Sequence, residues 1–217
     1  MEIRKSEIFR YLGYKKNQYD TETEMIVDEI TEKLLSVISP KSLYREYPLC
    51  MNDDKMEIGG YSGMLINSKG LKKNLDGCDK AILFAATLGS EADALIRRYQ
   101  VTSIAKAAIA QAVSTEIIEA YCNETVELIK EEKLKDGYFL RPRFSAGYGD
   151  FELSHQRDFF KMLEITKNLG IYLTDECLMV PTKSVTAVIG ISKKADTSQK
   201  ENCSNCNKKD CEYRNEI

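Results

Sequence analysis

The chain has 217 residues, of which 43% are hydrophobic and 30% are charged, and it carries a formal net charge of −3 with a pI near 5.5. This composition is typical of a globular chain that forms one generous domain, or a core plus an extension. The acidic balance argues against a nucleic-acid-binding protein, which normally needs a concentrated basic face. No apolar run reaches the roughly 18 residues of a membrane span, so we expect no membrane segment.

The cysteines and the single histidine limit the kinds of disulfide, metal and catalytic sites that the chain can form. The N-terminal stretch MEIRKSEIFRYLGY lacks the apolar core of a secretory signal, so we expect a cytoplasmic protein. In that reducing compartment the seven cysteines are not expected to form a disulfide framework. Four are scattered through apolar surroundings, and three crowd into nine residues near the C-terminus. The single histidine, His155, excludes a three-histidine zinc site and a pair of catalytic imidazoles.

The first third of the chain predicts a helix followed by strands. The helix is expected to begin at Thr21, because Thr21 and Glu24 form a capping-box pattern and apolar residues recur on one helical face. These apolar residues are Ile26, Ile30, Leu34 and Ile38. Segments 42–50 and 55–67 are strand-like, and a Gly-Gly pair interrupts the second of them.

The middle of the chain predicts a buried strand and two helices. The continuously apolar segment 80–89 is typical of a strand that is buried on both faces. A short helix over residues 90–100 follows it, with Ser90 as the expected N-cap. Residues 102–133 have the pattern of a long helix. Its first half is rich in alanine, so neighbouring elements can approach it closely.

The last part of the chain completes the predicted fold. A strand is expected over residues 136–144, and then a helix that Ser154 caps and Gly170 ends. Segments 171–181 and 184–192 have the character of closing strands. The order of elements lacks the steady βαβ alternation of a doubly wound fold. We therefore expect an α+β fold, with helices packed on a bent antiparallel or mixed sheet.

The stretch RPRFSAGYGD, residues 141–150, contains the residue types of an anion-binding loop. Gly147 and Gly149 can adopt positive φ and expose backbone N–H groups. Arg143 can clamp a carboxylate or phosphate with two parallel hydrogen bonds, and Tyr148 offers a ring face and a hydroxyl. The same residues also fit an ordinary glycine turn between a strand and a helix, and spacing alone leaves both interpretations open.

This loop and the segments after it resemble the activation domain of vitamin B12-dependent methionine synthase. That family has an Arg-x-x-x-Gly-Tyr loop, then a helix, a short strand, and a further strand with Met-x-Pro and Ser-Val. Here the pattern reads as RFSAGY over residues 143–148, GIYLT over 170–174, MVP over 179–181 and SV at 184–185. The resemblance covers roughly residues 80–192, about half of the chain, and it is to a short, free-standing form of the domain.

The resemblance implies that the chain binds S-adenosylmethionine. The family pattern places the binding residues at Glu119, Arg143, Ser145, Gly147 and Tyr148. The methionyl carboxylate suits the guanidinium of Arg143, and Glu119 on the long helix can face the ammonium or sulfonium charge. Glu119 also has an ordinary explanation as a solvated charge on a helix.

Two features of the family site have no match in this sequence. The family uses an aspartate near the N-terminal end of the domain, and none aligns here. It also uses a tyrosine beyond the last strand, where this chain has only Tyr213 within a polar segment. One side of the pocket is therefore expected to be built differently, or to bind the ligand more weakly.

The resemblance also implies an accessory subunit with no catalytic residue of its own. In the family, the domain docks over a cobalamin-bearing module whose cobalt has been oxidised, and it presents S-adenosylmethionine for reductive methylation. The electron comes from a flavodoxin or a similar, ferredoxin-like donor. His155 lacks the Asp-x-His-x-x-Gly setting of a cobalamin ligand and is expected to lie at a helix N-terminus. An activator of another corrinoid methyltransferase would look the same in sequence.

The sequence changes character after residue 192, so we predict one domain over 1–192 and a polar, cysteine-rich tail over 193–217. In the tail, Cys203, Cys206 and Cys211 have C-x2-C-x4-C spacing, which suits zinc or an iron–sulfur cluster. A fourth ligand could be another cysteine of the chain (50 or 78), a carboxylate, a second subunit or an exogenous molecule. A thiol redox role and a passive tail are the alternatives. If the thiols are the functional part, the chain is a redox protein and the glycine loop is merely structural.

Overall fold

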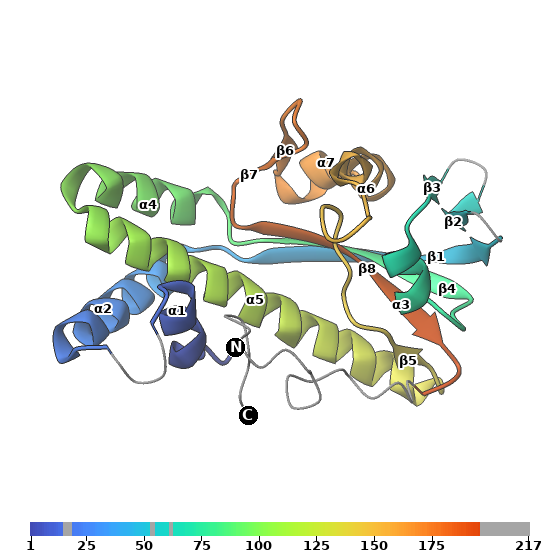
Figure 1. The fold of residues 1–217 in the computed structure, drawn as a ribbon, viewed down its shortest axis with the longest axis horizontal. Coiled ribbons are helices and arrows are strands. Elements are labelled where there is room, and N and C mark those ends of the chain that lie inside the picture. The colour runs from blue at the N-terminus through green and yellow to red at the C-terminus, as the bar shows by residue number, and fades with distance from the viewer. Residues whose placement is uncertain (15–18, 53–54, 61–62, 196–217) are drawn as a thin grey trace.

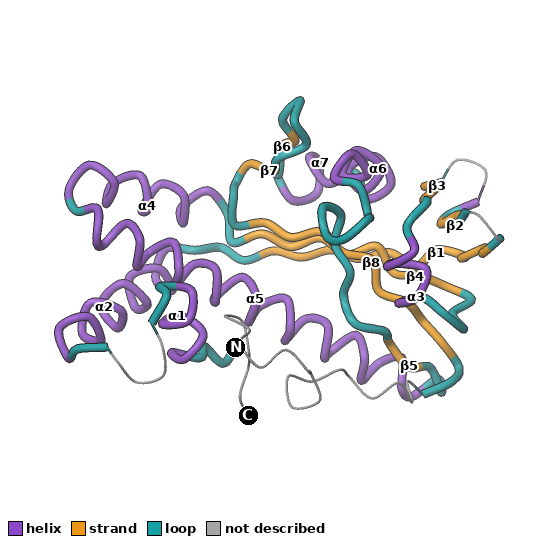
Figure 2. Tube along the Cα trace, in the orientation of Figure 1, coloured by secondary structure: helices purple, strands orange, loops and turns teal. Residues whose placement is uncertain are grey.

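The structure, a computed structural model, describes residues 1–14, 19–52, 55–60 and 63–195. One antiparallel sheet with the strand order β3-β2-β1-β4-β8-β5 forms the centre, and helices cover both of its faces (Figures 1 and 2). The expected α+β fold is thus confirmed. None of the described helices is long and apolar enough to cross a membrane.

The elements follow one another in this order: α1 (Lys5–Tyr11), α2 (Thr21–Val37), β1 (Lys41–Met51), β2 (Met56–Ile58), β3 (Met64–Ile66), α3 (Lys69–Asn74), β4 (Lys80–Thr87), α4 (Ser90–Thr102), α5 (Ile104–Lys135), β5 (Phe139–Leu140), a 3-10 turn (Leu153–His155), α6 (Gln156–Leu163), α7 (Ile165–Leu169), β6 (Tyr172–Leu173), β7 (Met179–Val180) and β8 (Ser184–Ser192).

Strand β4 lies between β1 and β8 and is buried from its second residue to its end. Successive side chains of a strand point to opposite faces, so its apolar residues serve two separate cores. Ile82 and Phe84 pack against helices α1, α2, α4 and α5 on one face. Leu83 and Ala85 pack against α3, α6 and α7 on the other. This double burial explains why the predicted strand reads as continuously apolar.

Helix α5 has 32 residues, about 48 Å at the usual rise, and crosses the sheet diagonally in Figure 1. Alanines in its first half are buried against neighbouring elements, as the composition predicts; they are Ala107, Ala110 and Ala112. The helix begins at Ile104 rather than at residue 102, because Ser103 has extended backbone and its hydroxyl accepts from the N–H of Lys106.

Two predicted N-caps are wrong by one residue. Helix α2 is capped by Asp20 rather than Thr21, and the Asp20 carboxylate accepts from the backbone N–H of Thr23 at 2.7 Å. The N-cap of helix α4 is Gly89, and Ser90 is already helical. Gly89 has a φ of 88°, which glycine adopts at little energetic cost.

The predicted helix over residues 153–170 is interrupted. A 3-10 turn comes first, and α6 and α7 are separated by Glu164, which has left-handed backbone with φ 51° and ψ 45°. The side chain of Asn168 donates to the Leu163 carbonyl at this break, at 2.9 Å. Ser154 does not cap a helix, because its hydroxyl bonds to Glu152. Gly170 ends α7 with φ 70°, as predicted.

Two predicted strands differ from those observed. Segment 171–181 forms its own hairpin, β6–β7, apart from the main sheet. Segment 136–144 contains only the two-residue strand β5, followed by a bridge between Phe144 and Val188. Segment 184–192 is β8, as predicted.

The loop between β7 and β8 is tied to the start of α4 by a buried carboxylate. Asp93 accepts from the backbone N–H of Thr182 at 2.8 Å and from its hydroxyl at 2.6 Å. Because Asp93 is only 8% exposed, both donors of Thr182 would lose their partner in a truncated variant.

Asp93→Ala is expected to lower the free energy of unfolding by about 2 kcal/mol, the usual cost of leaving buried donors unsatisfied. Chemical denaturation measures it. Glu29→Ala, which removes an exposed ion pair with Lys106, is the control and should cost at most about 0.5 kcal/mol. Equal effects of the two changes would contradict the role given to Asp93.

Candidate functional site

The loop from Arg141 to Phe151 carries most of the predicted binding residues. It leaves the sheet at the edge formed by β8, where Phe144 and Val188 exchange two backbone hydrogen bonds of 2.9 Å each. It then turns and enters the segment before α6, passing in front of the sheet in Figure 1. The predicted residues are therefore held beside an edge of the central sheet.

The turn itself is built by its two glycines. Gly147 and Gly149 have φ of 93° and 59°, as their predicted role requires. A Cβ on Gly147 would also lie 3.2 Å from Leu153 Cδ1, which is a tight contact. The prediction that Gly147 offers a free backbone N–H is wrong, since this group donates to the Phe151 carbonyl at 2.7 Å. The turn is closed by its own hydrogen bonds, and Tyr148 N–H donates to the Ser145 carbonyl at 3.3 Å.

The structure brings Arg143 and Glu119 together, although 24 residues separate them in sequence. Arg143 Nη2 donates to Glu119 Oε2 at 2.8 Å and to Asn123 Oδ1 at 2.9 Å. Glu119 and Asn123 are four residues apart on α5 and so share a face. Among the described residues, Nε and Nη1 of Arg143 have no hydrogen-bond partner. These two donors point to different sides of the guanidinium, so each can donate a separate hydrogen bond to a ligand.

Sequence reasoning missed Asn123. Its signal was its spacing of four residues from Glu119 on the predicted long helix. A neutral amide there holds the guanidinium without a second negative charge, so the Arg143–Glu119 pair stays balanced.

Cys122 lies beneath this pair and is fully buried on α5. Burial raises the pKa of its thiol to about 12, while the nearby charge of Arg143 lowers it slightly. The thiol is thus neutral at physiological pH and acts as an apolar group in the core.

The N-terminal segment lies against α5, the helix that carries Glu119. The backbone N–H and the Nε of Arg4 both donate to Glu116 Oε1, at 3.2 and 3.1 Å. The ammonium of Met1 bonds to Glu124 at 2.7 Å. Glu116 is fully buried, and its Oε2 has no partner in the described part of the chain.

A shallow, open hollow of about 460 Å³ lies on the surface between α1 and α5, one helical turn before Glu119. Its lining is mostly uncharged and consists of Tyr11, Leu12, Ala108, Gln111, Ala112 and Thr115. The weakly polar hollow and the Arg143–Glu119 pair thus lie next to each other along α5.

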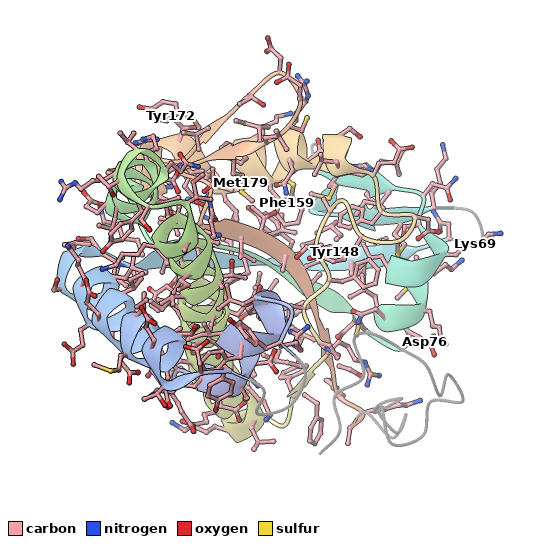
Figure 3. The ribbon with its side chains drawn as sticks, turned by 60° about the vertical axis from the view of Figure 1, so that its left-hand side comes forward. Lys69, Asp76, Tyr148, Phe159, Tyr172 and Met179 are labelled. Atoms are coloured by element: carbon pink, nitrogen blue, oxygen red, sulfur yellow. The ribbon has the colours of Figure 1, made fainter. Side chains whose placement is uncertain are left out.

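Asp150, which sequence reasoning also missed, fixes the far end of the loop. Its carboxylate accepts from the Ser68 hydroxyl at 2.6 Å and from the backbone N–H groups of Lys69 and Gly70 at 2.6 and 3.1 Å. The Ser68 hydroxyl bond and the two N–H groups hold the pKa of Asp150 below its ordinary value. Figure 3 shows Tyr148 on the loop and Lys69 at the start of α3.

The remaining predicted residues fall as follows. Tyr148 is 71% exposed. His155 lies in the 3-10 turn before α6, as expected for a helix N-terminus, and its Nδ1 is 2.8 Å from Asp158. Cys203, Cys206 and Cys211 lie outside the described residues. Of the suggested fourth ligands, Cys50 is exposed, contrary to its expected apolar setting, and Cys78 is buried. Within the described ranges no three His, Cys, Asp or Glu residues gather as a metal site would require.

Comparison with known proteins gave a family match and a solved structure with a similar fold. A family model described as "Vitamin B12 dependent methionine synthase, activation domain" matches residues 71–215. A solved structure titled "Crystal Structure of the MetH Reactivation Domain bound to AdoHcy" has the same fold, with a TM-score of 0.68 and 16% sequence identity. The alignment covers 89% of this chain and 75% of that chain. A search of curated proteins gave no match.

Alkylation tests the burial of Cys122 beneath the site. Because a thiolate is the reactive species, iodoacetamide at about pH 8 should modify exposed Cys50 at least on the order of 100-fold faster than Cys122. Peptide mass spectrometry reads both sites in one sample, and denatured protein, in which both react, is the control. Similar rates in the folded protein would mean that α5 opens at this point.

Proposed function

The chain belongs to the vitamin B12-dependent methionine synthase activation domain family, and we propose that it is a free-standing subunit that binds S-adenosylmethionine for reactivation of a methionine synthase. The observation that carries the proposal is the Arg143–Glu119 pair beside the Ser145–Tyr148 turn. Residues that the family pattern picks out from two distant segments meet at one place, and both signs of charge are present there.

The amino-acid head of the ligand suits this pair. Arg143 can donate a charge-assisted hydrogen bond from Nε or Nη1 to the α-carboxylate, and Glu119 can balance the ammonium or sulfonium charge. The Arg143 side chain is 18% exposed, so its hydrogen bonds are partly shielded from water. Ser145, Gly147 and Tyr148 form the adjacent turn, and the exposed Tyr148 ring can cover the adenosyl group.

The protein's contribution is to bind and orient. S-adenosylmethionine, when bound, supplies the methyl group for the partner's oxidised cobalamin, and a flavodoxin or ferredoxin-like donor supplies the electron. The site residues hold charges and shape, as expected for an accessory subunit whose chemistry belongs to cofactors. The partner is then a separate cobalamin-bearing module of methionine synthase.

A different corrinoid methyltransferase is the alternative partner. The ligand site would be the same, so ligand binding does not distinguish the two. Reactivation assays with cobalamin proteins of both classes do, because only the cognate protein should regain methylcobalamin in the presence of this chain, S-adenosylmethionine and a reductant.

Calorimetric titration of S-adenosylmethionine into the protein should show saturable binding. Arg143→Ala is expected to weaken it by on the order of 10- to 100-fold, because charge-assisted hydrogen bonds contribute about 1.5–3 kcal/mol. Arg45→Ala is a matched control, since Arg45 bonds to the Met162 carbonyl of α6 and has no contact with the Arg143–Glu119 pair. Unchanged binding by Arg143→Ala would contradict the proposed site.

We also propose that Cys203, Cys206 and Cys211 bind zinc or an iron–sulfur cluster, on the basis of their spacing. Anaerobically purified protein should then contain about one zinc per chain, or iron together with sulfide, and should lose it when Cys203 and Cys206 are changed to serine. Elemental analysis measures the metal. Metal-free wild-type protein would leave the tail without this role.

A further inference from the structure

Asp150 follows directly on the proposed ligand turn and bonds to an element 80 or more residues away. Its two carboxylate oxygens accept three hydrogen bonds from Ser68, Lys69 and Gly70 at the start of α3. The Ser68 hydroxyl in turn accepts from the Leu71 N–H at 3.0 Å, as the N-cap of the helix. Asp150 therefore joins the loop to the first turn of α3 through a set of linked hydrogen bonds.

The contact is also close in shape. A Cβ added to Gly70 would lie 3.1 Å from Asp150 Oδ1 and 3.2 Å from Phe144 Cζ. Gly70 thus lets the helix approach the two ends of the loop at once. A side chain at position 70 would push against both.

The ligand turn lies between two fixed points. Before it, Phe144 is bonded to Val188 of the central sheet, and after it, Asp150 is bonded to α3. Only Ser145 to Gly149 lie between these anchors. With one end released, the turn would gain backbone freedom that a ligand must remove on binding.

We propose that Asp150 is a positioning residue, which holds the Ser145–Tyr148 turn in its ligand-binding conformation by anchoring it to α3. This inference rests on the proposed function. Asp150 acts through the loop and touches no ligand itself. Its effect is to lower the ordering cost of binding, as supporting contacts behind a binding site do.

The test compares Asp150→Ala and Asp150→Asn with Asp20→Ala. Asp20 is a matched control because it caps α2 with the same chemistry, accepting from the N–H and hydroxyl of Thr23, and it lies outside the proposed site. S-adenosylmethionine affinity is measured by calorimetry. Hydrogen exchange of the amides of Gly147 and Phe151 is measured without ligand.

Asp150→Ala is expected to weaken S-adenosylmethionine binding about tenfold and to speed exchange of both amides, whereas Asp20→Ala changes neither. Asp150→Asn should recover part of the affinity, because one oxygen acceptor remains. A lowered melting temperature without these changes would show a purely structural role and overturn the inference. So would unchanged exchange in Asp150→Ala.

Gly70→Ala provides an independent check that does not remove the carboxylate. Alanine favours helix by about 1 kcal/mol over glycine, so α3 itself should not weaken. The added methyl group should nonetheless displace Asp150 and Phe144 and weaken ligand binding severalfold. Unchanged binding would count against the anchoring role.

Failure of this inference and failure of the proposed function have different signatures. If the wild-type protein binds no S-adenosylmethionine, the proposed function is wrong, and the ligand-positioning role of Asp150 falls with it. If the wild-type protein binds and Asp150→Ala binds equally well, only the inference about Asp150 is wrong.

Discussion

Burial of β4 on both faces is the constraint on which the rest of the architecture depends. Phe84 needs one layer of helices and Leu83 needs another, and α5 and α3 belong to these two opposite layers. The loop after β5 starts at the sheet edge formed by β8. From there it reaches α5 through Arg143 and α3 through Asp150, so that both layers and the sheet fix its path.

Structural features that depend on neighbouring residues could be predicted from the sequence. Features that depend on contacts between residues far apart in the chain could not. The apolar character of β4 and β8 and the long helical pattern of α5 predicted these elements to within two residues at each end. The break at Glu164 could not be predicted, because a glutamate with left-handed backbone carries no glycine or proline signal. Nor could the contact of Asp150 with α3, which joins residues 82 positions apart.

In the candidate site, too, some features could be predicted from the sequence and others could not. The family pattern assigns Glu119 and Arg143 to one binding site, and in the structure the two side chains form an ion pair at 2.8 Å. Spacing alone did not show that the pair is held by Asn123, or that the Gly147 N–H is used within the turn. A carboxylate and a guanidinium that bond to each other avoid the cost of leaving either charge half-buried and unpaired.

The position of β8 has a consequence for biosynthesis. This strand pairs with β4 from Lys80 to Thr87. The two strands are far apart in the chain: Ser184 bonds to Thr87, 97 positions earlier, and β8 ends at Ser192. Until that segment has left the ribosome, β4 has an unpaired edge and lacks part of the covering for both of its apolar faces. Such long-range pairing slows folding, and until it forms, apolar surface that promotes aggregation is exposed. The nascent chain is therefore one that chaperones should hold until the segment up to Ser192 has left the ribosome.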